Sequence, residues 1–308
     1  MTAPAPPTTR ATPPPRVSGT VRGRSLAWMT LPALVFFVAF AVVPLIGVVL
    51  LSFTSWDGLG AITFSGLDSW RAVLTDSGLL HSLWVTFLIT ALSWLIQTVL
   101  SILIGTFISS HQRYRNVLAV LYFIPLLLSS AAISITYSAL LDPNFGLGAG
   151  LGIPLLRQDW LGRGGLAVGV AVFVVSWQYI PFHSLIYQGG VRQIPRAMYE
   201  AAELDGAGRV RQFFSITLPQ LKYTFITSST LMIVGSLTAF DLIFVLTGGG
   251  PGDATRVLAV DMYKRGFQAN LMGPASAIAV IIVLVGLGVA LLMRRLSGDP
   301  TDSQLEGT

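Results

Sequence analysis

The chain of 308 residues has no cysteine, and its three histidines, His81, His111 and His183, stand far apart in the sequence. The missing thiols exclude disulfide bonds, cysteine-ligated zinc and thiol nucleophiles. The histidines match no metal-ligand spacing, and no glycine-rich phosphate-binding motif is present. We therefore expect no catalytic residue, no metal and no cofactor in this chain, and any nucleotide chemistry must come from another one.

Charged side chains are also scarce. Asp, Glu, Lys and Arg make up 11% of the residues, against about a quarter in a typical soluble domain. Hydrophobic residues make up 53%, and the mean hydropathy is +0.71. This composition predicts an integral membrane protein surrounded by lipid. The net charge of +5 does not indicate a nucleic-acid partner, because its placement follows membrane topology, as argued below.

Six apolar runs each approach the roughly 20 residues that a helix needs to cross a bilayer. They cover about Leu26–Leu51, Leu83–Ile108, Val117–Leu141, Leu166–Tyr187, Tyr223–Val245 and Pro274–Met293. We predict an all-α integral membrane fold with six transmembrane helices in one domain, residues 25–297. Residues 1–24, rich in Pro, Thr and Ala, are predicted to form a disordered tail, and residues 298–308 a second tail. A cleaved signal peptide is disfavoured because the first run is too long.

The basic residues are distributed unequally between the two sides. Thirteen of the 19 lysines and arginines fall on the side of the two termini. Because cytoplasmic loops carry the excess of Lys and Arg, this asymmetry predicts that both termini are cytoplasmic. The polar segment between the fourth and fifth runs is then cytoplasmic too.

This polar segment, residues 191–222, has its own helical pattern. Apolar residues recur at the 3.6-residue period on both sides of Asp205-Gly206, at Ile194, Ala197, Met198, Ala201 and Ala202, and again at Val210, Phe213, Phe214, Thr217 and Leu218. The pattern predicts two short amphipathic helices. Pro195 suits the first turn of the first helix, and Pro219 is expected to end the second.

Eight residues of the segment carry a resemblance to a known family. Glu200-Ala201-Ala202, Gly206 and Ile216-Thr217-Leu218-Pro219 resemble the EAA loop of the membrane subunits of bacterial binding-protein-dependent ABC importers. The resemblance implies that the loop contacts a cytoplasmic ATPase through Glu200, Ala201, Ala202, Asp205 and Gly206. The alternative, a helix pair lying in the lipid headgroups, is disfavoured because its acidic residues oppose an anionic leaflet.

The outer loops contain a second, shorter similarity. Thr247-Gly248-Gly249-Gly250-Pro251 resembles a turn found in the carbohydrate importers of this family, and Phe64-Ser65-Gly66-Leu67 resembles the loop that precedes their core helices. Glycine permits close approach of another chain, such as a solute-binding protein or a sister permease. A plain turn and an interfacial helix anchored by Trp70 remain equally open alternatives.

Polar and aromatic residues inside the apolar runs indicate a route for a solute. The second run carries Thr86, Thr90, Ser93, Gln97 and Ser101 on one helical face. Aromatic faces can stack on sugar rings, and amide or hydroxyl groups can bond sugar hydroxyls. The candidate substrate residues are Trp177, Gln178, Tyr179, Phe182, Ser236 and Asp241. The alternative that these side chains only pack against neighbouring helices remains open.

The resemblance implies a permease subunit, not an enzyme, that imports a sugar by alternating access in the plasma membrane. It also implies four kinds of partner: a second permease, which the family favours as a sister chain, two ATPase subunits that bind ATP and Mg²⁺, and an extracytoplasmic solute-binding protein. An ion-coupled transporter or channel is the alternative. It would need charged relays in the membrane, of which Asp241 is the only candidate, and it leaves the EAA loop unexplained.

Overall fold

The computed structural model describes residues 24–109 and 120–297. The predicted tails lie outside these residues, apart from Arg24, with which the first helix begins. The chain divides into two units, residues 1–47 and 48–308. The described part of the first unit is helical, from α1 (Arg24–Phe37) through one π-helical turn, η1 (Val38–Val42), into α2 (Val43–Leu51), and the boundary between the units falls within α2. No described side chain between residues 30 and 51 is buried.

After α2, two short strands and a short helix precede the first long helix of the second unit. The antiparallel strands β1 (Thr54–Ser55) and β2 (Thr63–Phe64) pair Thr54 with Phe64, and helix α3 (Asp68–Leu74) follows. The long helix α4 (Ser77–Ile108) begins after Asp76, whose carboxylate accepts a hydrogen bond from the Gly78 N–H at 2.8 Å. A side-chain acceptor at this position satisfies one of the free N–H groups of the helix end.

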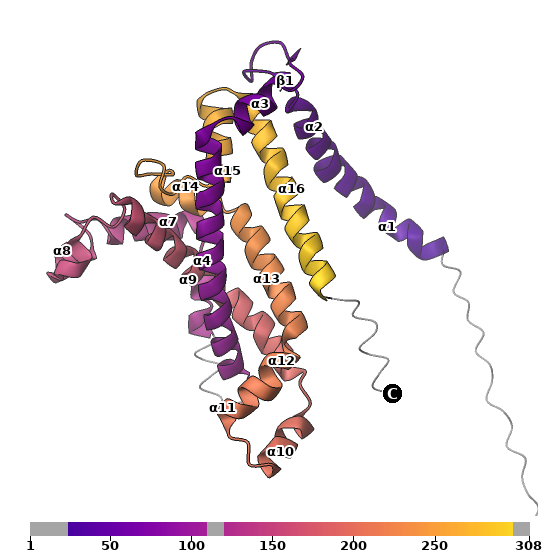
Figure 1. The fold of residues 1–308 in the computed structure, drawn as a ribbon, viewed down its shortest axis with the longest axis vertical. Helices are drawn as coiled ribbons and strands as arrows, with labels where there is room; N and C mark the ends of the chain where they lie inside the picture. Colours follow the sequence, from indigo (N-terminus) through magenta and orange to yellow (C-terminus); the bar gives the residue numbers. More distant parts are fainter. Residues whose placement is uncertain (1–23, 110–119, 298–308) are drawn as a thin grey trace, which may run out of the picture. The chain divides into compact units, whose positions relative to one another are not determined.

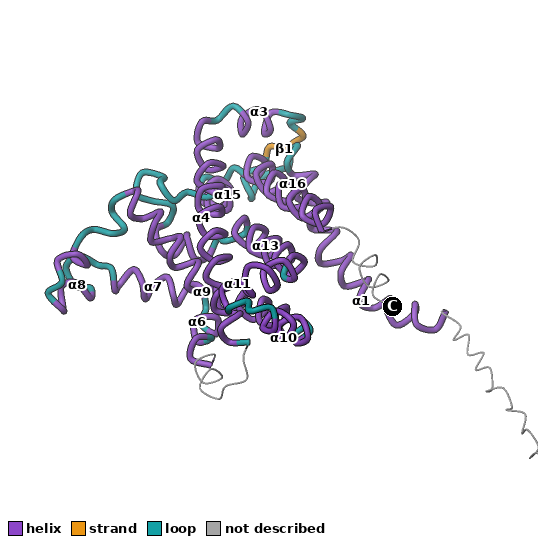
Figure 2. The backbone as a smooth tube through the Cα atoms, turned by 60° about the horizontal axis from the view of Figure 1, so that its bottom comes forward, coloured by secondary structure: helices purple, strands orange, loops and turns teal. Residues whose placement is uncertain are grey.

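Helix α9 (Gly164–Arg192) packs along α4 and forms the centre of the second unit. Figures 1 and 2 show the two helices side by side. Gly105 makes the close approach possible, since an added Cβ would lie 2.7 Å from the Ser184 carbonyl oxygen and 2.9 Å from the Tyr187 Cβ. The apolar faces of both helices continue into a buried core that includes Val85, Ile89, Val172, Val174 and Ile243.

The run predicted to form the third span is not a continuous helix where it is described. It is divided into α6 (Ile124–Leu127) and α7 (Ser130–Leu140), and residues 117–119 of the prediction lie outside the described residues. Leu128 and Ser129 are extended, and the Ser129 hydroxyl caps α7 by accepting from the Ala132 N–H at 3.2 Å. A serine hydroxyl thus begins a new helix here. The chain continues through α8 (Leu147–Leu151) and the 3₁₀ turn η2 (Pro154–Arg157).

The polar segment after α9 forms two helical pieces. The first is α10 (Arg196–Leu204), and the second runs without interruption through α11 (Arg209–Gln212), η3 (Phe213–Thr217) and α12 (Leu218–Gln220). The predicted break at Asp205-Gly206 is confirmed, with Gly206 at φ +74°. The second piece ends at Gln220, one residue after Pro219, which agrees with the predicted role of this proline. Pro195 directly precedes α10.

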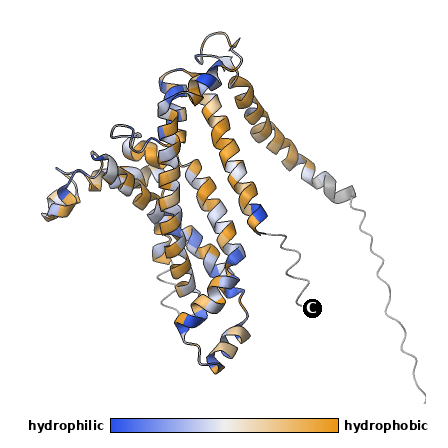
Figure 3. Ribbon diagram, viewed as in Figure 1, coloured by the Kyte–Doolittle hydropathy of each residue, from blue (hydrophilic) through white to orange (hydrophobic). Residues whose placement is uncertain are grey.

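The fifth apolar run forms α13 (Lys222–Leu237) with α14 (Asp241–Thr247), and the sixth lies within α16 (Met272–Ser297). Between them lie α15 (Leu258–Tyr263) and η4 (Lys264–Gln268). Helices α13 and α14 meet at a bend of 47°. Within the described residues, four helices are long and apolar enough to cross a membrane, or five if this bent pair counts as one span. Figure 3 shows α16 coloured mostly as hydrophobic, with a hydrophilic last turn. Arg294 and Arg295 lie in this turn.

Candidate functional site

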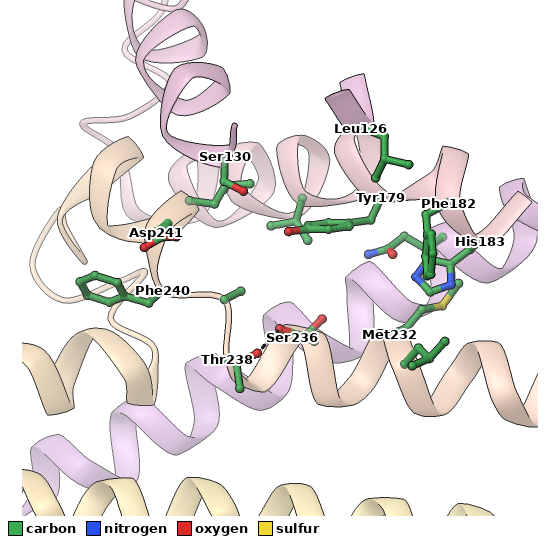
Figure 4. Close-up of a pocket in the computed structure, with 16 residues that line it drawn as sticks. Leu126, Ser130, Tyr179, Phe182, His183, Met232, Ser236, Thr238, Phe240 and Asp241 are labelled. Carbon is green, nitrogen blue, oxygen red and sulfur yellow. Dashed lines mark hydrogen bonds between the residues drawn. The ribbon is translucent and has the colours of Figure 1, made fainter. Parts of the chain in front are cut away.

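A cavity of about 500 Å³ lies at the break between α13 and α14. It is lined from α4, α6, α7, α9, α13 and α14 by Gln97, Leu126, Ser130, Val175, Tyr179, Phe182, His183, Leu231, Met232, Gly235, Ser236, Thr238, Ala239, Phe240, Asp241 and Leu242. Figure 4 shows the aromatic side chains of α9 on one side and Ser236, Thr238 and Met232 of α13 opposite them. The volume suits a small molecule of several rings at most.

Four of the six predicted substrate residues line this cavity: Tyr179, Phe182, Ser236 and Asp241. Tyr179 and Phe182 are three positions apart on α9, so they lie on one helical face. Each retains more than a third of its surface exposed. Ser236 is the penultimate residue of α13, and Asp241 begins α14. The helix break therefore brings a hydroxyl and a carboxylate to the same cavity.

The other two predicted residues do not line the cavity. Trp177 packs edge-on against Tyr137, with ring centroids 5.5 Å apart. Gln178 is buried, and its Nε2 donates to the Ser130 hydroxyl at 3.1 Å and to the Leu128 carbonyl at 3.4 Å. Since successive residues of an α-helix point about 100° apart, neighbours of Tyr179 in sequence face other helices.

Several residues that line the cavity were not predicted from the sequence. His183 follows Tyr179 by four positions, so the helical period could have identified it; its Nδ1 lies 3.0 Å from the Ser228 hydroxyl. Thr238 and Phe240 lie in the break between α13 and α14, which no pattern in the sequence predicted. Gln97 belongs to the polar face predicted for the second run and is the only one of those five to line the cavity.

The other four side chains of that polar face form hydrogen bonds with neighbouring helices or lie buried between helices. The Thr86 hydroxyl donates to the Ser82 carbonyl at 2.7 Å and accepts from the Leu258 N–H at 2.8 Å. The Ser101 hydroxyl donates to the Ile180 carbonyl of α9 at 3.2 Å. These contacts support the alternative that hydroxyls join helices inside the protein.

The predicted coupling residues gather at the surface of α10 and the turn that follows it. Glu200, Ala201, Asp205 and Gly206 are exposed, and Ala202 is half-buried. Tyr199 ties α10 to the second helical piece, because its hydroxyl lies 2.9 Å from that of Thr217. The two pieces also expose large apolar side chains, Leu204, Val210 and Phe214, which leaves an apolar and acidic surface available to another protein.

The glycine-rich turn after α14 is held by its own contacts. The Thr255 hydroxyl lies 2.6 Å from the Thr247 hydroxyl and donates to the Gly250 carbonyl at 2.8 Å. Gly248 and Gly249 have φ values of +59° and +89°, a region that favours glycine. The turn therefore requires these glycines for its own backbone, whether or not a partner approaches.

An ionic cluster connects this turn to the start of α4. The buried carboxylate of Asp261 accepts from Arg256 at 2.5 Å and from Arg265 at 3.1 Å, and Arg265 also pairs with Asp76. The hydrogen bond from Arg265, with a second from the Gly78 N–H, holds the pKa of Asp76 below its usual range. Burial alone would lower the pKa of Arg265, but hydrogen bonds to Asp76 and Asp261 outweigh it and raise this pKa. The cluster stabilises the junction of three separate segments.

Comparison with known proteins identifies a group of similar membrane proteins. Two relatives are the multiple sugar-binding transport system permease protein MsmF of Streptococcus mutans and the trehalose/maltose transport system permease protein MalF of Thermococcus litoralis. They are 31% and 30% identical to this chain, each alignment covering 86% of it, and 92% and 90% of the relative. A probable ABC transporter permease protein of Bacillus subtilis, YurN, is 30% identical over 86% of this chain and 92% of its own.

A solved structure shares the fold. It is a crystal structure of a bacterial ABC transporter involved in the import of the acidic polysaccharide alginate, with a TM-score of 0.78, 23% identity, and coverage of 90% of this chain and 96% of the other. The sequence model of the family described as "binding-protein-dependent transport system inner membrane component" matches residues 97–299. This range contains the helix pair with the EAA resemblance, most of the cavity lining and the glycine-rich turn. The chain therefore belongs to the family of binding-protein-dependent transport system inner membrane components.

Proposed function

We propose that this chain is a permease subunit that imports a sugar across the plasma membrane, in a complex driven by ATP. The relatives named for multiple sugars and for trehalose and maltose support a sugar as the solute. The observation that carries the proposal is the cavity at the α13–α14 break, with aromatic faces on one wall and hydroxyl groups on the other. Family membership disfavours an ion-coupled transporter.

The topology of the proposal has six spans with both termini in the cytoplasm. The run over 117–141, part of which lies outside the described residues, would be the third span. The excess of Lys and Arg on the side of the termini supports this orientation. The surface of α10 and its turn would then face the cytoplasm, and the glycine-rich turn would face outward.

The proposed partners would bind at the cytoplasmic face and at the outer face of this topology. Glu200, Ala201, Ala202, Asp205 and Gly206 would contact one of two ATPase subunits, which bind ATP and Mg²⁺. One chain with one such loop supplies one ATPase contact, so a second permease, a sister chain, would supply the other. The outer face would receive the solute from an extracytoplasmic binding protein.

Two helices connect the cavity to the proposed coupling surface, which is α10 and the turn that follows it, residues 196–206. Helix α9 lines the cavity at Tyr179 and ends at Arg192, just before α10 begins. Helix α13 starts directly after the helix pair, at Lys222, and reaches the cavity at Ser236. A movement of the helix pair would therefore reach both walls through rigid helices. The solute shifts the equilibrium between outward and inward states only through its different affinity for them.

The cavity wall favours an uncharged polyhydroxy solute. Tyr179, Phe182 and Phe240 offer apolar ring faces, while Ser130, Ser236 and Gln97 offer neutral donors and acceptors. Loss of one hydrogen bond to a buried sugar hydroxyl costs about 1–3 kcal/mol, which is a few-fold to a hundred-fold in affinity.

The test is sugar uptake by proteoliposomes that contain the whole complex, with radiolabelled maltose, trehalose and any further sugar retained by its binding protein. Tyr179→Ala and Ser236→Ala should reduce uptake at least five-fold and leave ATP hydrolysis without substrate unchanged. Leu185→Ala is the control, because Leu185 is an exposed residue of α9 that does not line the cavity. Equal effects of all three variants, or no saturable sugar uptake by the unmodified complex, would contradict the proposal.

A further inference from the structure

The cavity at the α13–α14 break has one formally charged side chain in its lining, that of Asp241. Neither lysine nor arginine is among the described residues that line it. The other polar side chains on the wall are the neutral ones of Gln97, Ser130, Tyr179, Ser236 and Thr238, and the imidazole of His183, which contacts the Ser228 hydroxyl. The wall therefore has a single unbalanced negative charge.

No other described group neutralises this carboxylate. Within residues 24–109 and 120–297, Asp241 takes part in no ion pair, and its side chain is exposed at the cavity. In the ionic cluster near the glycine-rich turn, Arg256 and Arg265 are both bound to Asp261, and neither forms an ion pair with Asp241. Figure 4 shows Asp241 beside Phe240, across the cavity from the hydroxyls of Ser236 and Thr238.

A carboxylate in such a wall acts differently on solutes of different charge. Its oxygens accept hydrogen bonds from sugar hydroxyls or from an ammonium group. A solute that carries its own carboxylate would place two negative charges in one cavity, partly shielded from water. Like charges repel more strongly there than in bulk solvent. The repulsion acts on any sugar acid, whatever its ring stereochemistry.

We infer that Asp241 selects solutes by charge, so that the cavity admits neutral sugars and amino sugars and rejects uronates and other sugar acids. This inference rests on the proposed function, since it assumes that the solute occupies this cavity. It adds a specificity-determining residue and narrows the class of solute. The remaining lining residues then supply stacking and neutral hydrogen bonds.

The charge of the cavity can be measured without knowing the natural solute, because the chain has no cysteine. Ser236→Cys is introduced into the complete complex, and the thiol is reacted at pH 8, where imidazoles are ordinarily neutral. Three methanethiosulfonates of similar size are used, one cationic, one neutral and one anionic. Mass spectrometry of this chain follows the rates. Asp241→Asn should lower the ratio of cationic to anionic rate by roughly ten-fold, and leave the neutral rate unchanged.

The control for the charge removal is Asp68→Asn, because Asp68 is exposed on α3 and does not line the cavity. It should leave the rate ratio unchanged. An identical ratio with and without Asp241 would overturn the inference. In transport assays, Asp241→Asn should increase inhibition of neutral-sugar uptake by a uronate disaccharide several-fold, and unchanged inhibition would also contradict the inference.

Reaction of the same thiol distinguishes a failure of this inference from a failure of the proposed function. A transported neutral sugar should slow the reaction of Ser236→Cys with the neutral reagent, because it occupies the cavity. Protection by the sugar without a charge-dependent rate would leave the solute site in place and refute the role of Asp241. A charge-dependent rate without protection would refute the solute site itself, and with it the inferred selection.

Discussion

The side-chain amide of Gln178 on α9 donates a hydrogen bond to the hydroxyl of Ser130, the first residue of α7, at 3.1 Å. The same nitrogen lies 3.4 Å from the Leu128 carbonyl, one residue before the cap of α7. Gln178 therefore holds the extended break between α6 and α7 against α9. This position explains why it is buried although it adjoins the cavity residue Tyr179.

The first prediction is that Gln178→Ala destabilises the protein in addition to any effect on transport. It leaves the Leu128 carbonyl and the Ser130 hydroxyl without this partner, at a cost of about 1–3 kcal/mol. Thermal unfolding of the purified complex should shift downward for Gln178→Ala and not for Tyr179→Ala. Gln158→Ala is the control, since the Gln158 amide contacts the Leu155 carbonyl on an exposed turn. A Gln178→Ala variant of normal stability but reduced transport would instead indicate direct contact with the solute.

The second prediction concerns the turn between the two helical pieces at the proposed coupling surface. Gly206 has φ +74°, whereas Gly208 has φ −67° and caps α11, and an added Cβ at either would meet no atom within 4 Å. The two positions differ in backbone strain alone. Gly206→Ser should therefore cost about 1–2 kcal/mol in this turn, whereas serine is favoured at the cap position of Gly208.

The measurement is sugar-stimulated ATP hydrolysis together with uptake in proteoliposomes. Gly206→Ser should reduce the number of solutes imported per ATP, and Gly208→Ser should not. Glu200→Lys, which reverses an exposed charge on α10, should have the same uncoupling effect if the ATPase presents a basic partner. Normal stoichiometry in both Gly206→Ser and Glu200→Lys would exclude this loop as the mechanical joint.

The third prediction concerns the pair formed by Asp76 and Arg265. Because hydrogen bonding by Arg265 lowers the pKa of Asp76 from 3.8, the folded protein gains stability from this group above that value. The gain is lost as the pH falls through the lower, folded-state pKa. Asp76→Asn keeps the cap on α4 and removes the charge. It should lower the free energy of unfolding by about 1 kcal/mol, because both side chains are partly exposed.

Denaturation of the purified protein between pH 3 and pH 8 tests this pair. The difference between the unmodified protein and Asp76→Asn should be constant above about pH 4 and shrink below it. Asp68→Asn is the control, since a carboxylate oxygen of Asp68 lies 4.0 Å from a guanidinium nitrogen of Arg71 and both side chains are more than 70% exposed. A pH-independent difference for Asp76→Asn would show that shape, not charge, accounts for its effect.

The fourth prediction concerns orientation in the membrane. A cysteine in place of Ala207, in the turn after α10, should react in intact cells only with reagents that cross the membrane. A cysteine in place of Leu59, which is almost fully exposed between β1 and β2, should react with impermeant reagents. The absence of native cysteine makes both signals specific to the new thiol. Impermeant labelling at position 207 would reverse the proposed orientation and remove the ATPase contact.

Sequence alone predicted the membrane class, the apolar runs and the helix pair of the coupling surface. These features depend on local composition and on the 3.6-residue period, which are readable in one segment at a time. The break at Asp205-Gly206 was predictable for the same reason, because glycine is the residue that adopts a positive φ at low cost. Tyr179 and Phe182 could be selected because their side chains are aromatic and lie inside an apolar run.

The tertiary structure alone decided which side chains share the cavity. Trp177 and Gln178 have the same chemistry as the lining residues, yet the rotation of α9 turns them toward Tyr137 and Ser130. Gln97, Phe240 and Asp241 meet at the cavity only because α13 and α14, which are bent by 47° relative to each other, pack against α4 and α9. Contacts of this kind depend on packing between segments far apart in the chain, and the periodicity within each segment does not contain that information.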